Sequence, residues 1–176
     1  MYTQEVLLDR EVIAKRVVEL GKEISVDYRG KKPLLVGILK GSFIFMADLL
    51  REIDPQVGAQ VDFMAVTSYG FGKESSRQPK IEKDLSIDIK GRHVIITEDI
   101  VDMGYSFETL LAILSSRQPA SLKTCALLSK PDRREVEVPI DYLGFTIENK
   151  WIEGYGIDTA EDFRGLKDVV FRRESS

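Results

Sequence analysis

The residues best suited to chemistry form an acidic run that follows a strongly apolar stretch of the chain. Glu98 and Asp99 come directly after residues 94–97, Asp102 lies three positions further on, and Gly104 follows it. Adjacent carboxylates can accept hydrogen bonds from vicinal hydroxyls or reach a hard cation through water, and Asp102 could act as a base on the same ligand. Gly104 would let the backbone approach an anion where a helix begins. The spacing fits a ligand site and, equally well, a solvated acidic turn that caps a helix.

The elements that must position this run alternate between helices and strands. Asp9 to about Tyr28 repeats apolar residues at helical spacing, which predicts an amphipathic helix with Asp9 as its cap. Residues 69–80 are polar, contain glycine and lack an apolar period, which predicts a surface loop. Further helices are expected at about 42–53, with Ser42 as cap, and 107–117, and strands at 34–38, 61–68, 85–89, 93–99, 123–128, 142–147 and 169–171, together with a short strand in the tail after residue 150. Such alternation is typical of an α/β protein with a mainly parallel sheet.

The composition indicates one globular domain. The chain has 176 residues, of which 43% are hydrophobic and 31% charged, and its net charge is -4. An isoelectric point near 5.2 argues against nucleic acid as a partner. A single cysteine and a single histidine exclude an internal disulfide and a His/Cys zinc site. The apolar runs are too short to span a bilayer and the N-terminus lacks the features of a secretory signal, so we expect a cytoplasmic protein without membrane contact.

The acidic run at residues 98–106 resembles the phosphoribosylpyrophosphate (PRPP) motif of type I phosphoribosyltransferases, and the chain is similar to their hypoxanthine-guanine branch. The resemblance covers nearly the whole chain, because it also includes segments at 39–42, 67–69, 128–130 and 148–164 in the right order. It implies a five-stranded, mainly parallel sheet flanked by helices. It also implies one domain over residues 1–176, with a core at about 9–147 and a small hood formed by the N-terminal residues and about 148–173.

The resemblance implies roles for the acidic run and for the residues that would bind pyrophosphate. Glu98 and Asp99 match the residues that bind the ribose hydroxyls of PRPP, and Asp102 matches the general base near purine N7. The 5′-phosphate cradle matches Asp102, Met103, Gly104, Tyr105 and Ser106. The residues that match pyrophosphate contacts are Lys40, Gly41, Ser68, Tyr69 and Arg164, with a cis peptide expected between Lys40 and Gly41.

The resemblance also implies a purine site and a metal site. Trp151 matches an aromatic residue that stacks on the purine, and the backbone of Ile152 matches a contact at the ring edge. Lys130 and Lys150 match positions near the 6-oxo group, where an ammonium donor favours 6-oxopurines over adenine. Mg²⁺ would be held by Asp158, with Glu98 and Asp99 nearby. The expected reaction converts hypoxanthine, and guanine, with PRPP to IMP or GMP and pyrophosphate, in a homodimer or homotetramer.

The chain departs from the family pattern at a few positions. Met103 stands where the family has Thr or Ser, and a thioether cannot donate a hydrogen bond to the phosphate. Tyr105 replaces a residue that is often basic, and Glu153 stands where an apolar residue is commoner. The basic turn at Arg133 and Arg134 is interpreted as a solvated surface. The alternatives are a regulatory protein that senses PRPP or a nucleotide on the same fold, for which Met103 is the best support, and a xanthine-preferring phosphoribosyltransferase.

Overall fold

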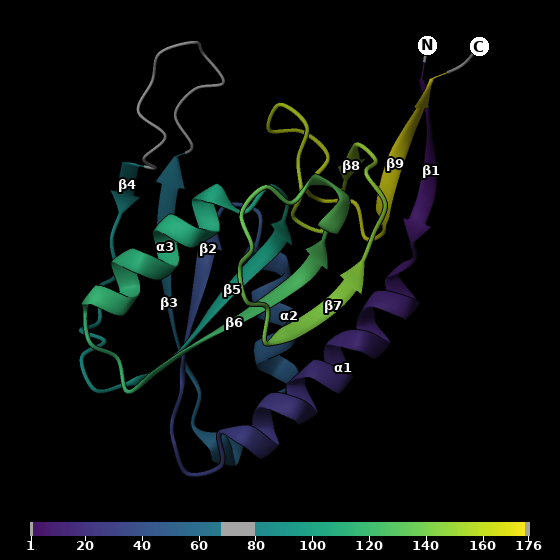
Figure 1. Cartoon of the computed structure of the whole chain (residues 1–176). Helices are drawn as coiled ribbons and strands as arrows, with labels where there is room; N and C mark the ends of the chain where they lie inside the picture. Colours follow the sequence, from purple (N-terminus) through teal and green to yellow (C-terminus); the bar gives the residue numbers. More distant parts are fainter. Residues whose placement is uncertain (1, 68–79, 175–176) are drawn as a thin grey trace.

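The computed structural model describes residues 2–67 and 80–174. A six-stranded sheet with the order β4-β3-β2-β5-β6-β7 forms its centre (Figure 1). All neighbouring pairs are parallel except β3 and β4. The strands are β2 (Leu34–Leu39), β3 (Gln60–Thr67), β4 (Lys80–Lys83), β5 (His93–Val101), β6 (Ser121–Ser129) and β7 (Tyr142–Thr146). The five parallel strands agree with the predicted sheet, to which β4 adds an antiparallel edge.

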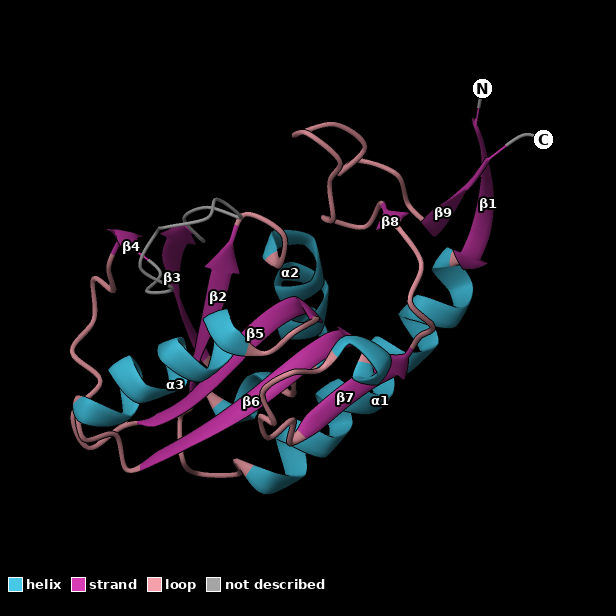
Figure 2. Ribbon diagram, turned by 45° about the horizontal axis from the view of Figure 1, so that its top comes forward, coloured by secondary structure: helices cyan, strands magenta, loops and turns pink. Residues whose placement is uncertain are grey.

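Three helices cover the two faces of this sheet. Helices α1 (Arg10–Asp27) and α2 (Phe43–Glu52) lie on one face and α3 (Tyr105–Ser116) on the other, and short 3-10 turns occupy Pro55–Val57 and Pro131–Arg133 (Figure 2). The cap of α1 is confirmed, because Asp9 accepts hydrogen bonds from the amides of Glu11 and Val12 at 2.8 and 3.0 Å. Ser42 occupies the N-cap position of α2, but its hydroxyl donates to the Ile38 carbonyl at 2.7 Å, so its expected role as a side-chain cap is wrong.

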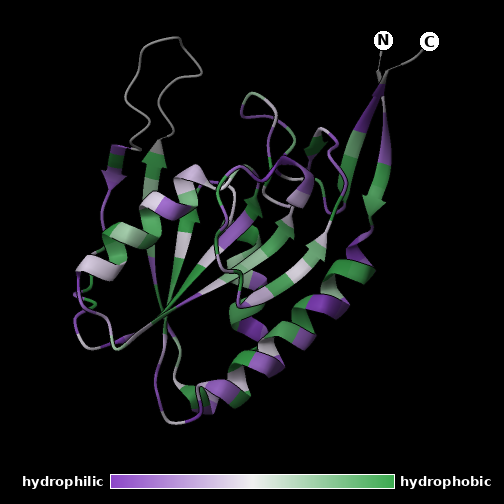
Figure 3. Cartoon of the chain, viewed as in Figure 1, coloured by the Kyte–Doolittle hydropathy of each residue, from purple (hydrophilic) through white to green (hydrophobic). Residues whose placement is uncertain are grey.

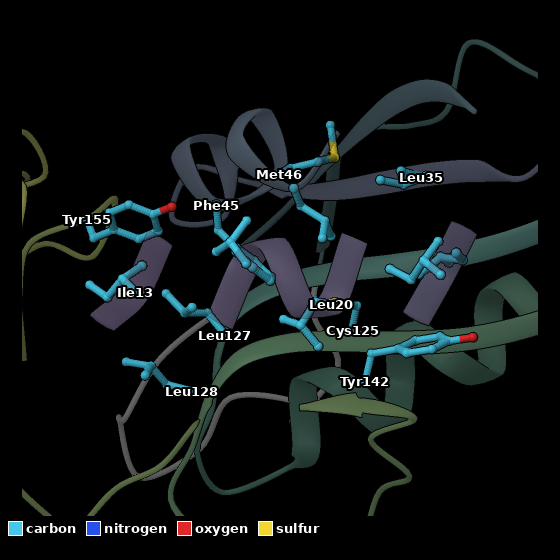
Figure 4. Close-up of a cluster of buried hydrophobic side chains, with 14 of the residues drawn as sticks. Ile13, Leu20, Leu35, Phe45, Met46, Cys125, Leu127, Leu128, Tyr142 and Tyr155 are labelled. Carbon is cyan, nitrogen blue, oxygen red and sulfur yellow. The ribbon is translucent and has the colours of Figure 1, made fainter. Parts of the chain in front are cut away.

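The central strands are rich in apolar residues because both faces of the sheet are covered. One face packs against α1 and α2 through Leu35, Ile95, Cys125 and Leu127, and Figure 4 shows this cluster around α1. The other face packs against α3 through Leu34, Val36, Val94, Ile96 and Ala126. Along helix α1 hydrophobic and hydrophilic residues are instead interleaved, as expected of a helix that buries one face and exposes the other (Figure 3).

The chain changes direction between the two central strands. From β2 it passes through α2 to β3 on one side, and from β5 it passes through α3 to β6 on the other side. Strands β2 and β5 are themselves parallel neighbours. Ligands bind outside the carboxyl ends of the strands at such a switch point, because the two connections diverge there and leave a crevice. Lys40 follows β2, and the acidic run begins with Glu98 and Asp99 in the last part of β5 and continues to Asp102 in the loop after it.

The strand expected at residues 85–89 is wrong. The alternating apolar side chains of this segment do pack against the α3 side of the core, but the amides of Ser86 and Ile87 donate to the buried carboxylate of Asp62, at 2.7 and 2.9 Å, rather than to a strand. The strand lies earlier, in β4, whose four residues include one apolar side chain. An exposed edge strand of this kind carries little hydrophobic pattern.

A second, three-stranded sheet joins the two ends of the chain. Strand β1 (Tyr2–Leu8) pairs antiparallel with β9 (Val169–Glu174), and β9 pairs antiparallel with β8 (Ile152–Glu153). Both ends of the chain therefore lie together beside this sheet (Figure 1). Within residues 2–67 and 80–174, no helix has the length and apolar character needed to cross a membrane.

Candidate active site

The loop after β2 is in direct contact with the carboxyl end of β5 and with the segment around Gly156. A Cβ atom on Gly41 would lie 1.9 Å from Oδ2 of Asp99, and one on Gly156 would lie 2.1 Å from the carbonyl oxygen of Gly41. Only glycine permits these approaches. The peptide preceding the loop is cis between Leu39 and Lys40, so the expected position one residue later is wrong. Neither bond involves proline, and the sequence therefore gives no signal that separates them.

Glu98, which is partly buried, and Asp99, which is buried, form an acidic pair at the carboxyl end of β5. Burial, the negative charge of Asp99 and a hydrogen bond between the two side chains raise the pKa of Glu98 well above its ordinary value. Burial raises the pKa of Asp99 to about 6, although backbone hydrogen bonds, the bond to Glu98 and the charge of Arg164 act in the opposite direction. Two carboxylates this close are stabilised by hydroxyl donors or a cation, which is the chemistry that the sequence predicts for them.

Asp102 has one oxygen engaged and one without a partner. Its Oδ2 lies 3.2 Å from Nη1 of Arg133, in an ion pair that is about one-third exposed. Its Oδ1 is buried and has no hydrogen-bond partner. Arg133 was interpreted as a solvated surface residue, and this interpretation is wrong because its guanidinium holds the candidate base. The arrangement leaves one carboxylate oxygen available to accept a proton from a ligand.

The loop that leads into α3 is held by the basic turn that follows β6. Arg134 donates to the carbonyls of Asp102 and Val101, at 2.8 and 3.0 Å, and to the hydroxyl of Ser129 at 2.9 Å. Its interpretation as a solvated residue is therefore also wrong. The carbonyl of Met103 accepts two backbone hydrogen bonds, at 3.0 Å each, from residues 135 and 136. These contacts fix the loop through its backbone, so the Met103 side chain is not needed for its shape.

Gly104 is required at the start of α3 for two reasons. Its φ of +99° lies in the left-handed region, and a Cβ atom there would lie 2.2 Å from the carbonyl oxygen of Val136. The first bond within the helix runs from the Glu108 amide to the Gly104 carbonyl at 2.9 Å, so the amides of residues 105–107 precede it. The exposed Ser106 lies in this first turn. The Tyr105 hydroxyl donates to Glu135 at 2.8 Å. A helix start of this kind is suited to an anion such as phosphate.

Arg164 and Lys40 share a carboxylate of this chain. Glu161 accepts from Lys40 at 2.8 Å and from Arg164 at 3.3 Å, and these bonds lower its pKa. Arg164 also pairs with Asp158 at 2.8 Å and donates to the Gly156 carbonyl at 2.8 Å. The two cations predicted for pyrophosphate thus converge on one anionic group. Sequence reasoning missed Glu161, which no spacing links to Lys40.

The two lysines expected near the purine have different surroundings. Lys130 is buried and donates to the backbone carbonyl of Lys150 at 2.7 Å. Burial lowers the pKa of Lys130, Arg133 adds to this effect, and Asp102 opposes it. The Lys150 ammonium instead lies 3.1 Å from Glu148 and 4.4 Å from the centre of the Phe171 ring. The ammonium of Lys130 is therefore fixed near enough to Asp102 for the two charges to interact, whereas the side chain of Lys150 is directed to Glu148 and Phe171.

Trp151, the residue expected to stack on the purine, is exposed to solvent and is followed by the two buried residues of β8. Trp151 is 62% exposed, and its Nε1 donates to the Thr159 hydroxyl at 2.8 Å. The next residue, Ile152, is buried in β8. Glu153, which stands where an apolar residue is commoner in the family, is fully buried. Ser68 and Tyr69 lie outside the described residues.

Polar atoms without partners gather at this site. In the described part of the chain, four buried side-chain atoms have no hydrogen-bond partner, namely Thr97 Oγ1, Glu98 Oε2, Asp102 Oδ1 and Arg164 Nε. Three of them follow one another along the end of β5 and the loop after it, and the charge of Arg164 acts on Asp99. A buried polar atom without a partner costs about 1–3 kcal/mol. Their concentration at the switch point indicates a site built for a polar ligand.

Comparisons with known proteins agree with this geometry. A family model described as a phosphoribosyl transferase domain matches residues 3–160. A hypoxanthine phosphoribosyltransferase of Escherichia coli (strain K12) is 48% identical over 167 residues, which cover 94% of this chain and 93% of that protein. A hypoxanthine-guanine phosphoribosyltransferase of Streptococcus pneumoniae is 44% identical over 171 residues, covering 97% and 94%.

The similarity extends to three dimensions. The crystal structure of a hypoxanthine phosphoribosyltransferase from Staphylococcus aureus matches with a TM-score of 0.91 and 40% identity, covering 96% of this chain and 91% of that one. This chain therefore belongs to the phosphoribosyl transferase family and, within it, to the hypoxanthine phosphoribosyltransferases.

Proposed function

We propose that this chain transfers the phosphoribosyl group of PRPP to hypoxanthine and guanine, with release of pyrophosphate. The observation that carries the proposal is the concentration of partnerless buried polar atoms at the switch point, on Thr97, Glu98, Asp102 and Arg164. In the reaction, the purine N9 forms a bond to C1′ of the ribose while the bond from C1′ to the pyrophosphate oxygen breaks. Positive charge develops on the ribose and negative charge on the leaving group.

Asp102 is the general base of this proposal. Its partnerless Oδ1 would accept the N7 proton as N9 attacks, while Oδ2 stays paired with Arg133 at 3.2 Å. Glu98 and Asp99 would accept hydrogen bonds from the ribose hydroxyls, in place of the hydrogen bond between their own side chains. The backbone amides at the start of α3 and the Ser106 hydroxyl would bind the 5′-phosphate without a contribution from the side chain of Met103.

The purine would lie between Trp151 and the end of β6. Trp151 offers an exposed ring face for stacking. Lys130, held at the Lys150 carbonyl, can direct a further N–H bond to the 6-oxo group. Adenine has an amino group at that position and would leave the ammonium without an acceptor, so a 6-oxopurine is favoured. The small sheet and residues 148–168 would form the hood over the base.

Pyrophosphate would take the place that Glu161 occupies beside Lys40 and Arg164. The Glu161 side chain is 64% exposed, so it can leave this position for solvent. A guanidinium and an ammonium that converge on one anion suit the charge that grows on the leaving group. The Arg164 Nε, which is buried without a partner, provides a further donor.

The acidic residues at the site fit a divalent cation bound mainly through water and substrate. No group of three or more potential metal-binding side chains gathers among residues 2–67 and 80–174, whereas a Mg²⁺ ion typically uses one or two carboxylates together with substrate phosphates. Asp158 would hold it, with Glu98 and Asp99 nearby, and the partnerless Glu98 Oε2 is consistent with this donor set. Bound Mg²⁺ would neutralise negative charge on the pyrophosphate.

The test is a spectrophotometric assay of the purified protein with PRPP, Mg²⁺ and one base at a time: hypoxanthine, guanine, xanthine or adenine. We expect turnover of hypoxanthine and guanine and the least turnover of adenine. A clear preference for xanthine would correct the substrate. If PRPP or IMP binds but no base reacts, the proposal is refuted and a ligand-sensing role takes its place.

A further inference from the structure

The sole tryptophan of the chain is held by a polar cluster of Thr159, Glu153 and Arg172, of which Glu153 is fully buried. Trp151 exposes 62% of its surface, and its Nε1 donates to Oγ1 of Thr159 at 2.8 Å. An exposed aromatic side chain with no polar contact would sample several ring orientations. This hydrogen bond selects the orientation that points the ring nitrogen at Thr159.

Thr159 is itself fixed in the backbone. Its amide and carbonyl form an antiparallel bridge with Asp162, at 3.2 and 3.1 Å. The two residues between them, Ala160 and Glu161, both have positive φ values, of 51° and 72°. Positive φ at both central residues is the geometry of a tight type I′ hairpin turn. The Thr159 hydroxyl, which accepts the hydrogen bond from Trp151, therefore lies next to a tight turn rather than in an open loop.

Glu153 joins the cluster through Arg172, which lies in the small sheet. It is fully buried and accepts hydrogen bonds from Gln4 in β1 and from Arg172 in β9, the latter at 3.0 and 3.2 Å. Burial raises its pKa, but the hydrogen bonds of Gln4, Arg172 and Thr159 lower it by more. Arg172 also donates its amide to the Trp151 carbonyl at 3.2 Å. The cluster therefore contacts both the side chain and the backbone of the tryptophan.

We infer that Thr159 and Glu153 are positioning residues that hold the Trp151 ring as a preformed stacking surface for the purine. The inference rests on the proposed function, because it assigns the purine to the exposed face of this ring. Preorganisation lowers the entropy that binding must remove from a side chain. It also accounts for a carboxylate at position 153: Glu153 does not contact the base but supports the residue that does.

The central test is a double-mutant cycle between Trp151→Phe and Thr159→Val. The first variant keeps a stacking ring and removes the N–H donor, and the second keeps the shape of the side chain and removes the acceptor. Thr159→Val alone should raise the Kd of IMP about three- to tenfold, as expected for freeing one side chain. In the Trp151→Phe background it should have no further effect. An equal effect in both backgrounds, or none in either, would overturn the inference.

A second readout needs neither turnover nor ligand. Because the chain has one tryptophan, its fluorescence anisotropy reports the mobility of this ring. Thr159→Val should lower the anisotropy of the free protein, and Glu153→Gln should lower it in the same direction. The exposed Thr3 on β1 provides a matched control, since Thr3→Val should leave both anisotropy and IMP binding unchanged.

The outcomes separate this inference from the proposed function. If the wild type binds no IMP and turns over no purine, the proposed function fails whatever the anisotropy shows. If IMP binds and anisotropy is the same in the wild type, Thr159→Val and Glu153→Gln, the positioning role fails while the proposed function stands. A drop in Thr159→Val but not in Glu153→Gln would refute the part assigned to Glu153.

Discussion

Gly104→Ala tests whether the loop at residues 102–104, which leads into α3, requires a glycine for its backbone conformation. At this position the new Cβ meets a left-handed φ of +99° and a carbonyl oxygen of Val136 at 2.2 Å. Gly91 has a similar φ of +70°, but a Cβ there has nothing within 4 Å. Gly91→Ala therefore should cost only the backbone term, about 1–2 kcal/mol. Gly104→Ala should add about 1–3 kcal/mol for the clash, for a total of about 2–5 kcal/mol.

The assay is urea unfolding of the two variants and the wild type, with the KM for PRPP measured on the same preparations. Gly104→Ala should lose more unfolding free energy than Gly91→Ala. Only Gly104→Ala should also show a higher KM for PRPP, because relief of the clash moves the start of α3. Equal losses of stability in the two variants, with an unchanged KM for PRPP, would refute the argument that contact with Val136 shapes the loop.

Two further substitutions test other contacts. Gly41→Ala places a Cβ 1.9 Å from Oδ2 of Asp99, so steady-state kinetics should show kcat/KM lower by about 100-fold, and an unchanged value would contradict the contact. Asp62→Ala leaves the amides of Ser86 and Ile87 without their acceptor and should cost about 1–3 kcal/mol in urea unfolding near neutral pH. Burial raises the pKa of Asp62, but its backbone hydrogen bonds lower it by more. Its stabilisation is thus complete above the unfolded pKa of about 3.9 and is lost as pH falls through the lower folded pKa, so a difference between wild type and variant that persists in strong acid would contradict the account.

The sequence predicts the central strands well because their pattern is local. The apolar runs at Leu34–Leu39 and 94–96 are continuous, as expected of strands covered on both faces. The sequence predicts a strand at 85–89, whereas the strand lies at β4, and the difference has a physical reason. Apolar alternation reports burial of side chains, whereas strand pairing depends on where the amides find acceptors, and Asp62 takes two of them.

The candidate site is predicted in part for the same reason. Glu98 at the end of β5 and Asp102 just after it lie four positions apart, so their place at one edge of the sheet is readable from spacing. Other partners come from distant segments, namely Arg133 at Asp102 and Glu161 at Lys40, and Thr159 meets Trp151 across a turn of irregular chain. No periodicity encodes such contacts. From its sequence the turn of Arg133 and Arg134 is predicted to be a solvated surface, and only the fold places it against Asp102.

The most direct test of the account is the rate of IMP formation in Asp102→Asn. The amide keeps the size of the side chain but cannot accept the N7 proton as a base, so kcat should fall about 100- to 10,000-fold while PRPP still binds. Asp132→Asn, on the exposed turn beside Arg133, is the matched control and should retain wild-type kcat. A kcat for Asp102→Asn close to that of the wild type would contradict the assignment of Asp102 Oδ1 as the proton acceptor.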